Sequence, residues 1–229
     1  MKEIEPIAFF RSPLTSKFGV PRQSGLAPRL RGRIVFEPKY RNADALRGLE
    51  DFDYVWLIWG FSHAVRHKGG ANEPNSFVPT VRPPRLGGNQ HVGVFASRSP
   101  FRPNGLGLSS VRIVGIEGTD MVVAGADLMD GTPIYDVKPY LREADSHTDA
   151  RSGFADTHPW QTLKVDLPAS LSQKLTAQEA SALIDVLAQD PRPQYQQDEN
   201  RVYGMAYSHY NVRFRVSGGT LYVVSIESE

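Results

Sequence analysis

The chain has 229 residues and a formal net charge of +1, enough length to bury one large core and form a smaller second unit. Its longest apolar run, Tyr54 to Phe61, is too short to cross a bilayer, and its lack of cysteine excludes disulfides, zinc–thiolate sites and cysteine nucleophiles. The opening MKEIEPIAFF lacks the apolar core of a secretory signal, so we expect a cytoplasmic protein with no membrane partner.

The charge is unevenly distributed along the chain. Residues 1–112 contain 17 Lys and Arg against 8 Asp and Glu, whereas residues 113–229 contain 9 against 17. Arginine outnumbers lysine 19 to 7, which suits the recognition of phosphates and bases. A polyanion is the simplest partner for the basic half, although the two halves would also neutralise each other if they packed together.

Short β-rich runs separated by Gly- and Pro-rich turns fill the first 165 residues. This pattern favours a β-sandwich or barrel over alternating βαβ units. One short helix is predicted over Asn42–Leu49. The expected strands are Ile4–Arg11, Gly32–Phe36, Tyr54–Ser62, His91–Ala96, Leu108–Ile116, Met121–Ala126, Ile134–Tyr140 and Thr162–Leu167.

The composition changes near residue 168. Thr176 and Glu179 have the spacing of a capping box, apolar residues then recur at helical spacing to Leu187, and Pro191 ends the helix. Two β-like runs around Ser217–Gly219 then predict a hairpin. We expect a β-rich first unit at residues 1–168 and a small α+β unit at residues 169–229.

Common catalytic fingerprints are missing. Gly105–Leu106–Gly107 precedes a β-like run instead of a helix, which argues against a dinucleotide-type Rossmann site. His63 and His67 are the one histidine pair near metal-ligand spacing, but no carboxylate is spaced to complete a site, so no metal is expected.

The densest polar segment is Gly93–Ser109, GVFASRSPFRPNGLGLS. Arg98, Arg102 and Asn104 share this loop with two prolines and several glycines, a composition that favours a rigid concavity rich in hydrogen-bond donors. The alternative is a surface turn whose arginines are simply solvated.

This segment resembles the hallmark of the TsaA-like family. Three other segments match the family in the same order: PRQSGLAP from residue 21, DFDYVWLIWGFSH from residue 51 and ADLMDGTPIYDVKPY from residue 126. DPRPQY, from residue 190, is similar to the extra domain of the bacterial, TrmO-type members. The match covers nearly the whole chain.

The resemblance implies a mainly β fold, a single-sheeted seven-stranded β-barrel, in a homodimer whose cofactor pocket lies near the dimer interface. It implies S-adenosylmethionine as cofactor and methylation of N6 of threonylcarbamoyladenosine (t6A) at position 37, in the anticodon loop of tRNA. No catalytic base is assigned. The implied cofactor residues are Pro21, Arg22, Gln23, His63, Ala64, Arg98, Leu108, Asp127, Leu128, Asp130 and Gly131.

Several of these residues have simpler interpretations. Asp130–Gly131 is also a favoured turn pair, and His63 would also fit the end of a strand. For Asp136 and Lys138, a cross-strand ion pair is the favoured interpretation.

RNA recognition has its own candidates. Arg29, Arg31 and Arg33 alternate, which places three positive charges on one strand face suited to phosphates. Arg98, Arg102 and Arg192 are candidates for binding the threonyl carboxylate. The tyrosines at 195, 203, 207 and 210 are candidates for base stacking, with core roles equally compatible. The substrate candidates are Arg29, Arg31, Arg33, Arg102, Asn104, Asp190, Arg192 and Tyr195.

Three other functions stay open at this level. The chain would also fit a binding module without turnover, or a related methyltransferase with another substrate. A nucleotide hydrolase is disfavoured because no metal cluster or activated nucleophile is visible. Because all implied cofactor residues precede residue 132, we expect that removing residues after Ala169 leaves cofactor binding largely intact.

Overall fold

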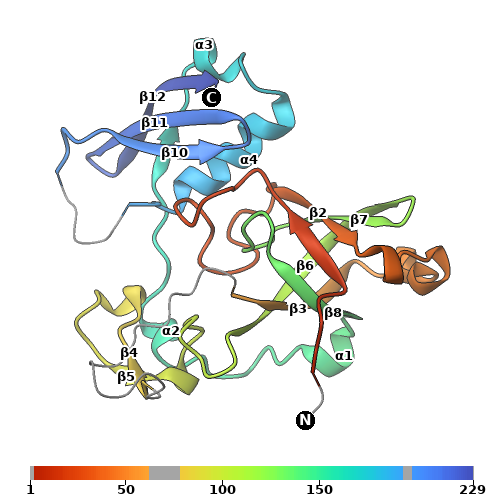
Figure 1. The fold of residues 1–229 in the computed structure, drawn as a ribbon. Helices are drawn as coiled ribbons and strands as arrows, with labels where there is room; N and C mark the ends of the chain where they lie inside the picture. Colours follow the sequence, from red (N-terminus) through yellow and green to blue (C-terminus); the bar gives the residue numbers. More distant parts are fainter. Residues whose placement is uncertain (1–2, 62–77, 193–197, 229) are drawn as a thin grey trace, which may run out of the picture.

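A computed structural model describes residues 3–61, 78–192 and 198–228, and it is mainly β. In the described residues, no helix combines the length and apolar character needed to span a membrane. Two units are visible in Figure 1: a barrel built from the first 139 residues, and a smaller sheet with a helix packed against it.

Six antiparallel strands close the barrel in the order β1-β2-β7-β6-β3-β8. Alternating burial, as in β3 where Val55, Leu57 and Trp59 are buried, directs one face of each strand into the core. The expected seventh strand is not part of this barrel in the described residues. The barrel strands are β1 (Ala8–Arg11), β2 (Arg31–Phe36), β3 (Tyr54–Gly60), β6 (Leu106–Glu117), β7 (Asp120–Ala124) and β8 (Pro133–Pro139).

The strand expected over His91–Ala96 is reduced to two residues. It becomes β5 (Val92–Gly93), which pairs with β4 (Thr80–Val81) in a separate two-stranded sheet. Prolines in the PTVRPPRLGG connection remove backbone donors, which keeps this sheet short. The described strands therefore form a two-stranded sheet in addition to the barrel and the C-terminal sheet.

The second unit is a four-stranded sheet in the order β10-β11-β12-β9. The predicted capping box is confirmed: Thr176 Oγ1 accepts from the Glu179 amide, and the Glu179 carboxylate accepts from the Thr176 amide. The hairpin is also confirmed, with Gly218 and Gly219 both at positive φ between paired Ser217 and Thr220. The elements are β9 (Lys164–Asp166), β10 (Tyr203–Tyr207), β11 (Tyr210–Ser217), β12 (Thr220–Ser228) and α4 (Ala177–Ala188).

Strand β9 pairs in parallel with β12 and so belongs to this second sheet. The sequence placed the strand in the first unit, ahead of a boundary near residue 168. Its neighbours in sequence gave no sign that its partner lay more than fifty residues further on.

The remaining helices are short. The helix predicted over 42–49 is wrong: Asn42 caps a 3₁₀ turn through the Asp44 amide, and Gly48 at φ +88° breaks the run. The short α-helices are α1 (Arg142–Asp145), α2 (Phe154–Thr157) and α3 (Ala169–Ser172), and the 3₁₀ turns are Pro38–Tyr40, Ala43–Leu46, Leu49–Asp51, Pro84–Leu86 and Val94–Ala96.

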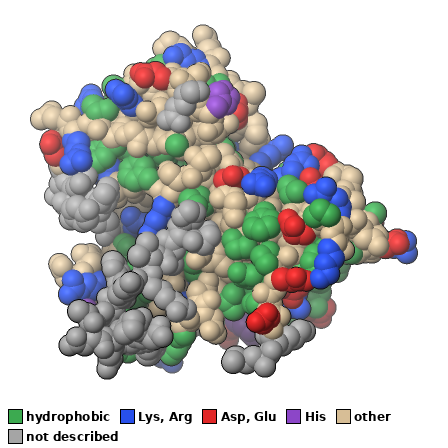
Figure 2. Space-filling model, in the orientation of Figure 1, with side chains coloured by type: hydrophobic (Ala, Val, Ile, Leu, Met, Phe, Trp, Pro, Cys, Tyr) green, Lys and Arg blue, Asp and Glu red, His purple; other side chains and the backbone are tan. Residues whose placement is uncertain are grey.

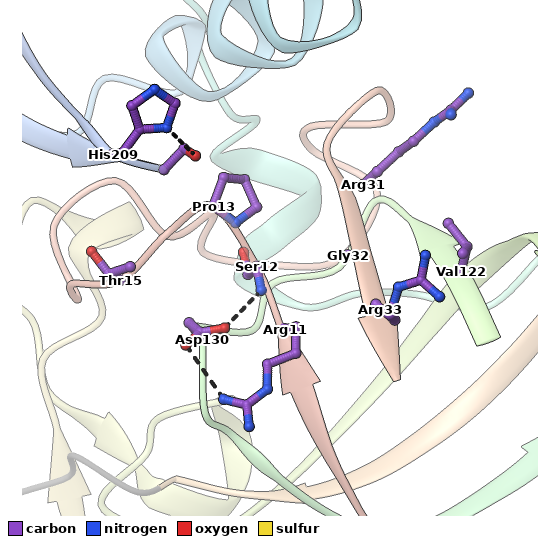
Figure 3. Close-up of a pocket in the computed structure, with 11 residues that line it drawn as sticks. Arg11, Ser12, Pro13, Thr15, Arg31, Gly32, Arg33, Val122, Asp130 and His209 are labelled. Atoms are coloured by element: carbon purple, nitrogen blue, oxygen red, sulfur yellow. Dashed lines mark hydrogen bonds and ion pairs between the residues drawn. The ribbon is translucent and has the colours of Figure 1, made fainter. Parts of the chain in front are cut away.

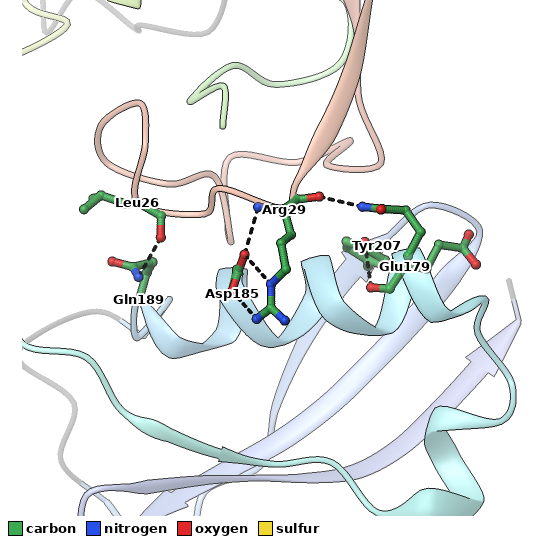
Figure 4. Close-up of polar contacts among 7 residues, drawn as sticks. Leu26, Arg29, Glu179, Asp185, Gln189 and Tyr207 are labelled. Atoms are coloured by element: carbon green, nitrogen blue, oxygen red, sulfur yellow. Dashed lines mark hydrogen bonds and ion pairs between the residues drawn. The ribbon is translucent and has the colours of Figure 1, made fainter. Parts of the chain in front are cut away.

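Each unit has its own hydrophobic core, and the β1–β2 connection joins them. Leu14, Ala27 and Leu30 lie in the core of the second unit, packed among residues of α4 and the second sheet. Arg29 binds Asp185 of α4 through its guanidinium and its backbone amide (Figure 4). The connection thus fixes the second unit against the barrel.

Candidate functional site

Three side chains form a hydrogen-bonded chain where β3, β6 and the segment after β7 meet. Trp59 Nε1 donates to Ser109 Oγ at 3.0 Å, and the Ser109 hydroxyl donates to Asp127 Oδ1 at 2.6 Å. Trp59 and Ser109 are buried, whereas Asp127 keeps part of its surface exposed. The chain therefore fixes a carboxylate that a ligand can still reach. We call these three residues the Asp127 network.

A glycine makes this network possible. Trp59 lies opposite Gly107 in the β3–β6 pair, and a Cβ at residue 107 would lie 2.3 Å from the indole ring. Because residue 107 has no side chain, the indole crosses β6 and reaches Ser109, two residues further along the same face.

The environment of Asp127 combines burial with donors. Burial raises the pKa of Asp127 above its ordinary value, while the Ser109 hydroxyl, two backbone amides and the Arg98 guanidinium act in the opposite direction. A carboxylate held in this way, in partly dehydrated surroundings, is typical of a functional site.

The loop that contains Pro21–Gln23 lies against this carboxylate. The backbone amide of Ser24 hydrogen-bonds Asp127, and Gly25 N donates to Gly125 O at 2.8 Å. The Pro21–Gln23 loop therefore lies next to Asp127, and the Arg98 guanidinium acts on this carboxylate electrostatically.

The side chain of Arg22 points to a tryptophan that the sequence did not single out. The guanidinium carbons of Arg22 and Arg85 lie 5.3 and 4.7 Å from the centre of the Trp160 ring. Burial lowers the pKa of Arg22, and Asp190 opposes that shift. Arg85 Nε and Trp160 Nε1 are buried and have no hydrogen-bond partner among the described residues.

Arg102 holds the GVFASRSPFRPNGLGLS loop together. Its Nη1 donates to Ser97 O at 2.6 Å and to Val94 O at 3.3 Å, while Ser97 Oγ donates to Val94 O at 2.9 Å. Because its guanidinium bonds these carbonyls, Arg102 acts first as a structural residue. Asn104 stays exposed on the same loop.

Apolar side chains project from this loop into solvent. Phe95 is 69% exposed, Leu108 is 55% exposed and Phe101 is 38% exposed. Leu108 precedes Ser109 in β6, so its side chain is on the opposite face of the strand from the Asp127 network.

Two family models match the chain. The model described as the tRNA-methyltransferase O N-terminal domain matches residues 9–146, and the TrmO C-terminal domain matches residues 160–229.

The chain belongs to the tRNA-methyltransferase O (TrmO) family.

Relatives match over most of the chain. The tRNA (adenine(37)-N6)-methyltransferase of Escherichia coli K12 is 38% identical over 237 residues, covering 98% of this chain and 97% of the relative. A Pseudomonas aeruginosa protein whose name describes an S-adenosylmethionine-dependent methyltransferase is 42% identical over 209 residues, covering 88% and 87%. A crystal structure of TrmO from that species has a TM-score of 0.79 at 32% identity, covering 100% of this chain and 98% of the other.

The structure separates the expected cofactor segment at residues 127–131. Leu128 is buried in the barrel core. Asp130 accepts from Ser12 N at 3.0 Å and lies away from the Asp127 network, and Gly131 has φ +76° in a turn closed by Thr132 N donating to Met129 O. Asp130 and Gly131 therefore form a turn, and their part in cofactor binding stays a prediction. Neighbouring Asp136 pairs with Lys138 at 3.0 Å along β8, not across strands.

The expected arginine stripe is divided. Arg29 precedes β2 and is bound to Asp185, so it is not on the strand face. Arg31 and Arg33 do share that face, and Arg33 pairs with Glu117. On the face shown in Figure 2, charges of both signs are interspersed over the barrel half.

The TrmO-type C-terminal candidates are mostly engaged within the protein. Arg192 forms two hydrogen bonds to Asp190, at 2.8 and 2.9 Å, and Asp190 raises its pKa. Tyr203 and Tyr207 have buried rings, and Tyr207 donates to Glu179 O at 3.1 Å. The prediction that these two tyrosines stack on bases is therefore wrong. Tyr210 donates to Lys174 O at 2.9 Å.

Three candidates, His63, Ala64 and Tyr195, lie outside the described residues. Sequence reasoning missed Trp59, Ser109, Arg85 and Trp160. Ser109 ends the hallmark segment and Trp59 lies in a matching one, so those two had a signal in the family pattern. Trp160 had none, because its partners lie 75 or more residues away in the chain.

Proposed function

We propose that this chain transfers a methyl group from S-adenosylmethionine to N6 of t6A at position 37 of tRNA. Membership of the TrmO family supports methyl transfer to tRNA. The observation that carries the proposal for this chain is that the Pro21–Gln23 loop lies next to Asp127, on which the Arg98 guanidinium acts electrostatically. A tRNA substrate implies a cytoplasmic reaction.

The residues at this site fit the chemistry of the cofactor. S-adenosylmethionine supplies an electrophilic methyl group on a sulfonium cation. Asp127 is an acceptor for ribose hydroxyls or for positive charge, and Ser109 keeps its carboxylate in place. The backbone of Pro21–Gln23 lies beside it, and Arg98 balances its charge.

The donors around Trp160 fit the carboxylate of the substrate. Arg85 Nε and Trp160 Nε1 are buried donors with no partner among the described residues, and such groups are costly unless a ligand satisfies them. They lie beside Arg22, which shares the loop at the Asp127 network. We therefore assign the threonyl carboxylate to the Arg22–Trp160–Arg85 cluster in preference to Arg102 and Arg192, which bond within the protein.

A homodimer is part of the proposal. Phe95, Phe101 and Leu108 expose large apolar side chains on or beside the hallmark loop. Exposed apolar groups gathered in this way are typical of an interaction surface. A second copy placed here would bring its own hallmark loop next to the cofactor segments.

The test is methylation of two matched tRNAs that differ only in the threonylcarbamoyl group at A37. With S-adenosylmethionine, the purified full-length chain should convert t6A, measured by mass spectrometry of nucleosides, and leave unmodified A37 unchanged. Equal methylation of both tRNAs would contradict the role of the carboxylate. Binding of cofactor and tRNA without product would indicate a binding module instead.

A further inference from the structure

A shallow hollow lies between the barrel and the C-terminal unit. It encloses about 560 Å³ and opens to solvent (Figure 3). Its walls are the end of β1, the outer face of β2, and the turn between β10 and β11. We call it the arginine groove, defined by Arg11, Arg31, Arg33 and His209. No residue of the Asp127 network lines it.

The barrel wall gathers like charges. In the β1–β2 pair, Arg11 lies directly opposite Arg33, and Arg31 is two residues from Arg33 on the same face of β2. Like charges directly opposite each other destabilise an antiparallel pair. A sheet that places three guanidiniums together gains from an anion that bridges them.

The carboxylates nearby do not occupy all three. Asp130 lies 3.7 Å from Arg11 and also accepts from the Ser12 amide, and Arg33 pairs with Glu117 and, at 3.6 Å, with Asp120. The Arg31 side chain has no hydrogen bond or ion pair with any described residue, although its backbone belongs to the β2–β7 pair. Because exposed ion pairs contribute little stability, phosphate oxygens can replace these carboxylates at small cost.

The opposite wall is fixed by the backbone. Ser208, at φ +57°, donates its amide to Pro13 O at 2.6 Å, which ties the β10–β11 turn to the end of β1. His209 packs against Tyr210 with ring centres 3.9 Å apart. The groove therefore keeps its shape while both its walls carry nitrogen donors.

We propose that the arginine groove binds the sugar–phosphate backbone of tRNA, away from the base that is methylated. This inference rests on the proposed function. Arginine donates paired hydrogen bonds to phosphate oxygens, and such contacts position a nucleic acid without reading its sequence. The groove differs from the predicted arginine stripe in one residue. Arg29 is paired with Asp185 of α4, and Arg11 of β1 lies beside Arg31 and Arg33 instead.

The test is the salt dependence of tRNA binding by the full-length chain. The double variant Arg11→Gln/Arg31→Gln should bind more weakly, with a log affinity–log salt slope flatter by about 0.7–0.9 per lost contact. Calorimetry should show unchanged S-adenosylmethionine affinity. Arg47→Gln/Arg142→Gln is the matched control, because it removes two exposed arginines outside the groove and should leave the slope unchanged.

Three results would contradict tRNA binding in the arginine groove. They are an unchanged salt-dependence slope in the double variant, an equal change of slope in the control, or a loss of cofactor affinity in the double variant. If the double variant does not fold, the salt dependence of tRNA binding is measured on Arg31→Gln alone, since the Arg31 side chain has no described partner to lose. Wild-type protein that neither binds nor methylates tRNA would contradict the proposed function itself. Wild-type activity with an unaffected groove variant would contradict the groove alone.

Discussion

The two hydrophobic cores are assembled in different ways. The barrel core is drawn almost entirely from the strands of one closed sheet and the segments that directly follow them. The second core combines α4 and the C-terminal sheet with Leu14, Ala27 and Leu30, which come from the opposite end of the chain. The barrel is thus close to self-contained, whereas the second unit needs the β1–β2 connection to complete its core.

That connection also carries the cofactor loop. Residues 12–30 pack into the second core, and within them Ser24 and Gly25 bond the barrel at Asp127 and Gly125. Removing the C-terminal unit would expose Leu14, Ala27 and Leu30 beside that loop. Contrary to the expectation from sequence, we therefore predict that removing residues after Ala169 weakens cofactor binding.

The largest expected effect separates the two cores. Leu14→Ala and Leu57→Ala each remove a fully buried leucine, and each should lower the free energy of unfolding by about 2–5 kcal/mol. Hydrogen exchange should show Leu14→Ala loosening α4, while Leu57→Ala loosens β3 and its neighbours. If Leu14→Ala leaves the α4 amides protected, the shared core is not what holds the second unit.

A smaller effect is expected on the barrel side of the connection. Asp127→Asn keeps an acceptor for Ser109 but removes the charge, and it should weaken S-adenosylmethionine binding by about 1.5–3 kcal/mol, measured by calorimetry. Ser109→Ala, which keeps the charge and frees the carboxylate, should weaken binding less. Equal affinity of Asp127→Asn and wild type would remove Asp127 from the cofactor site.

The same variant should change how stability depends on pH. Because the folded pKa of Asp127 is raised above 3.8, the folded state binds more protons than the unfolded state just above that pH. The protonated Asp127 side chain therefore contributes to the free energy of unfolding at low pH. This contribution is lost as the pH rises through the folded pKa of Asp127. Asp127→Asn should remove this loss, so urea unfolding should show the variant to be at least as stable at neutral pH.

The smallest expected effect is on the α4 side of the connection. A double-mutant cycle on Arg29→Ala and Asp185→Asn should give a coupling energy up to about 1 kcal/mol, since the pair is partly exposed. The exposed pair Arg47–Asp44, within one short turn, is the control and should couple more weakly. Equal coupling energies in both cycles would mean that the Arg29–Asp185 pair, between the β1–β2 connection and α4, is no stronger than an exposed pair.

The sequence predicted what local patterns encode. Alternating burial located β3, β6, β7 and β8 to within a few residues, and the capping box located the start of α4. TrmO family membership and its mainly β fold followed from four motifs in order.

Contacts between distant residues could not be read from the sequence. Arg29 and Asp185 are 156 residues apart, so an alternating arginine pattern looked like a free stripe when one member was already bound. The Asp127 network depends on Gly107 leaving room for Trp59, which a single sequence shows only as one glycine among several. The roles of His63, Ala64 and Tyr195 stay predictions.

Strand β12 has a consequence for the order in which the chain is made. It lies between β11 and β9 in the second sheet and follows every other described strand along the chain. Leu14, Ala27 and Leu30 are synthesised nearly two hundred residues before β12. At ordinary rates of synthesis, this corresponds to an interval of about 10–40 s. Until β12 is made, the nascent chain therefore carries an uncovered apolar segment beside a barrel that is able to close.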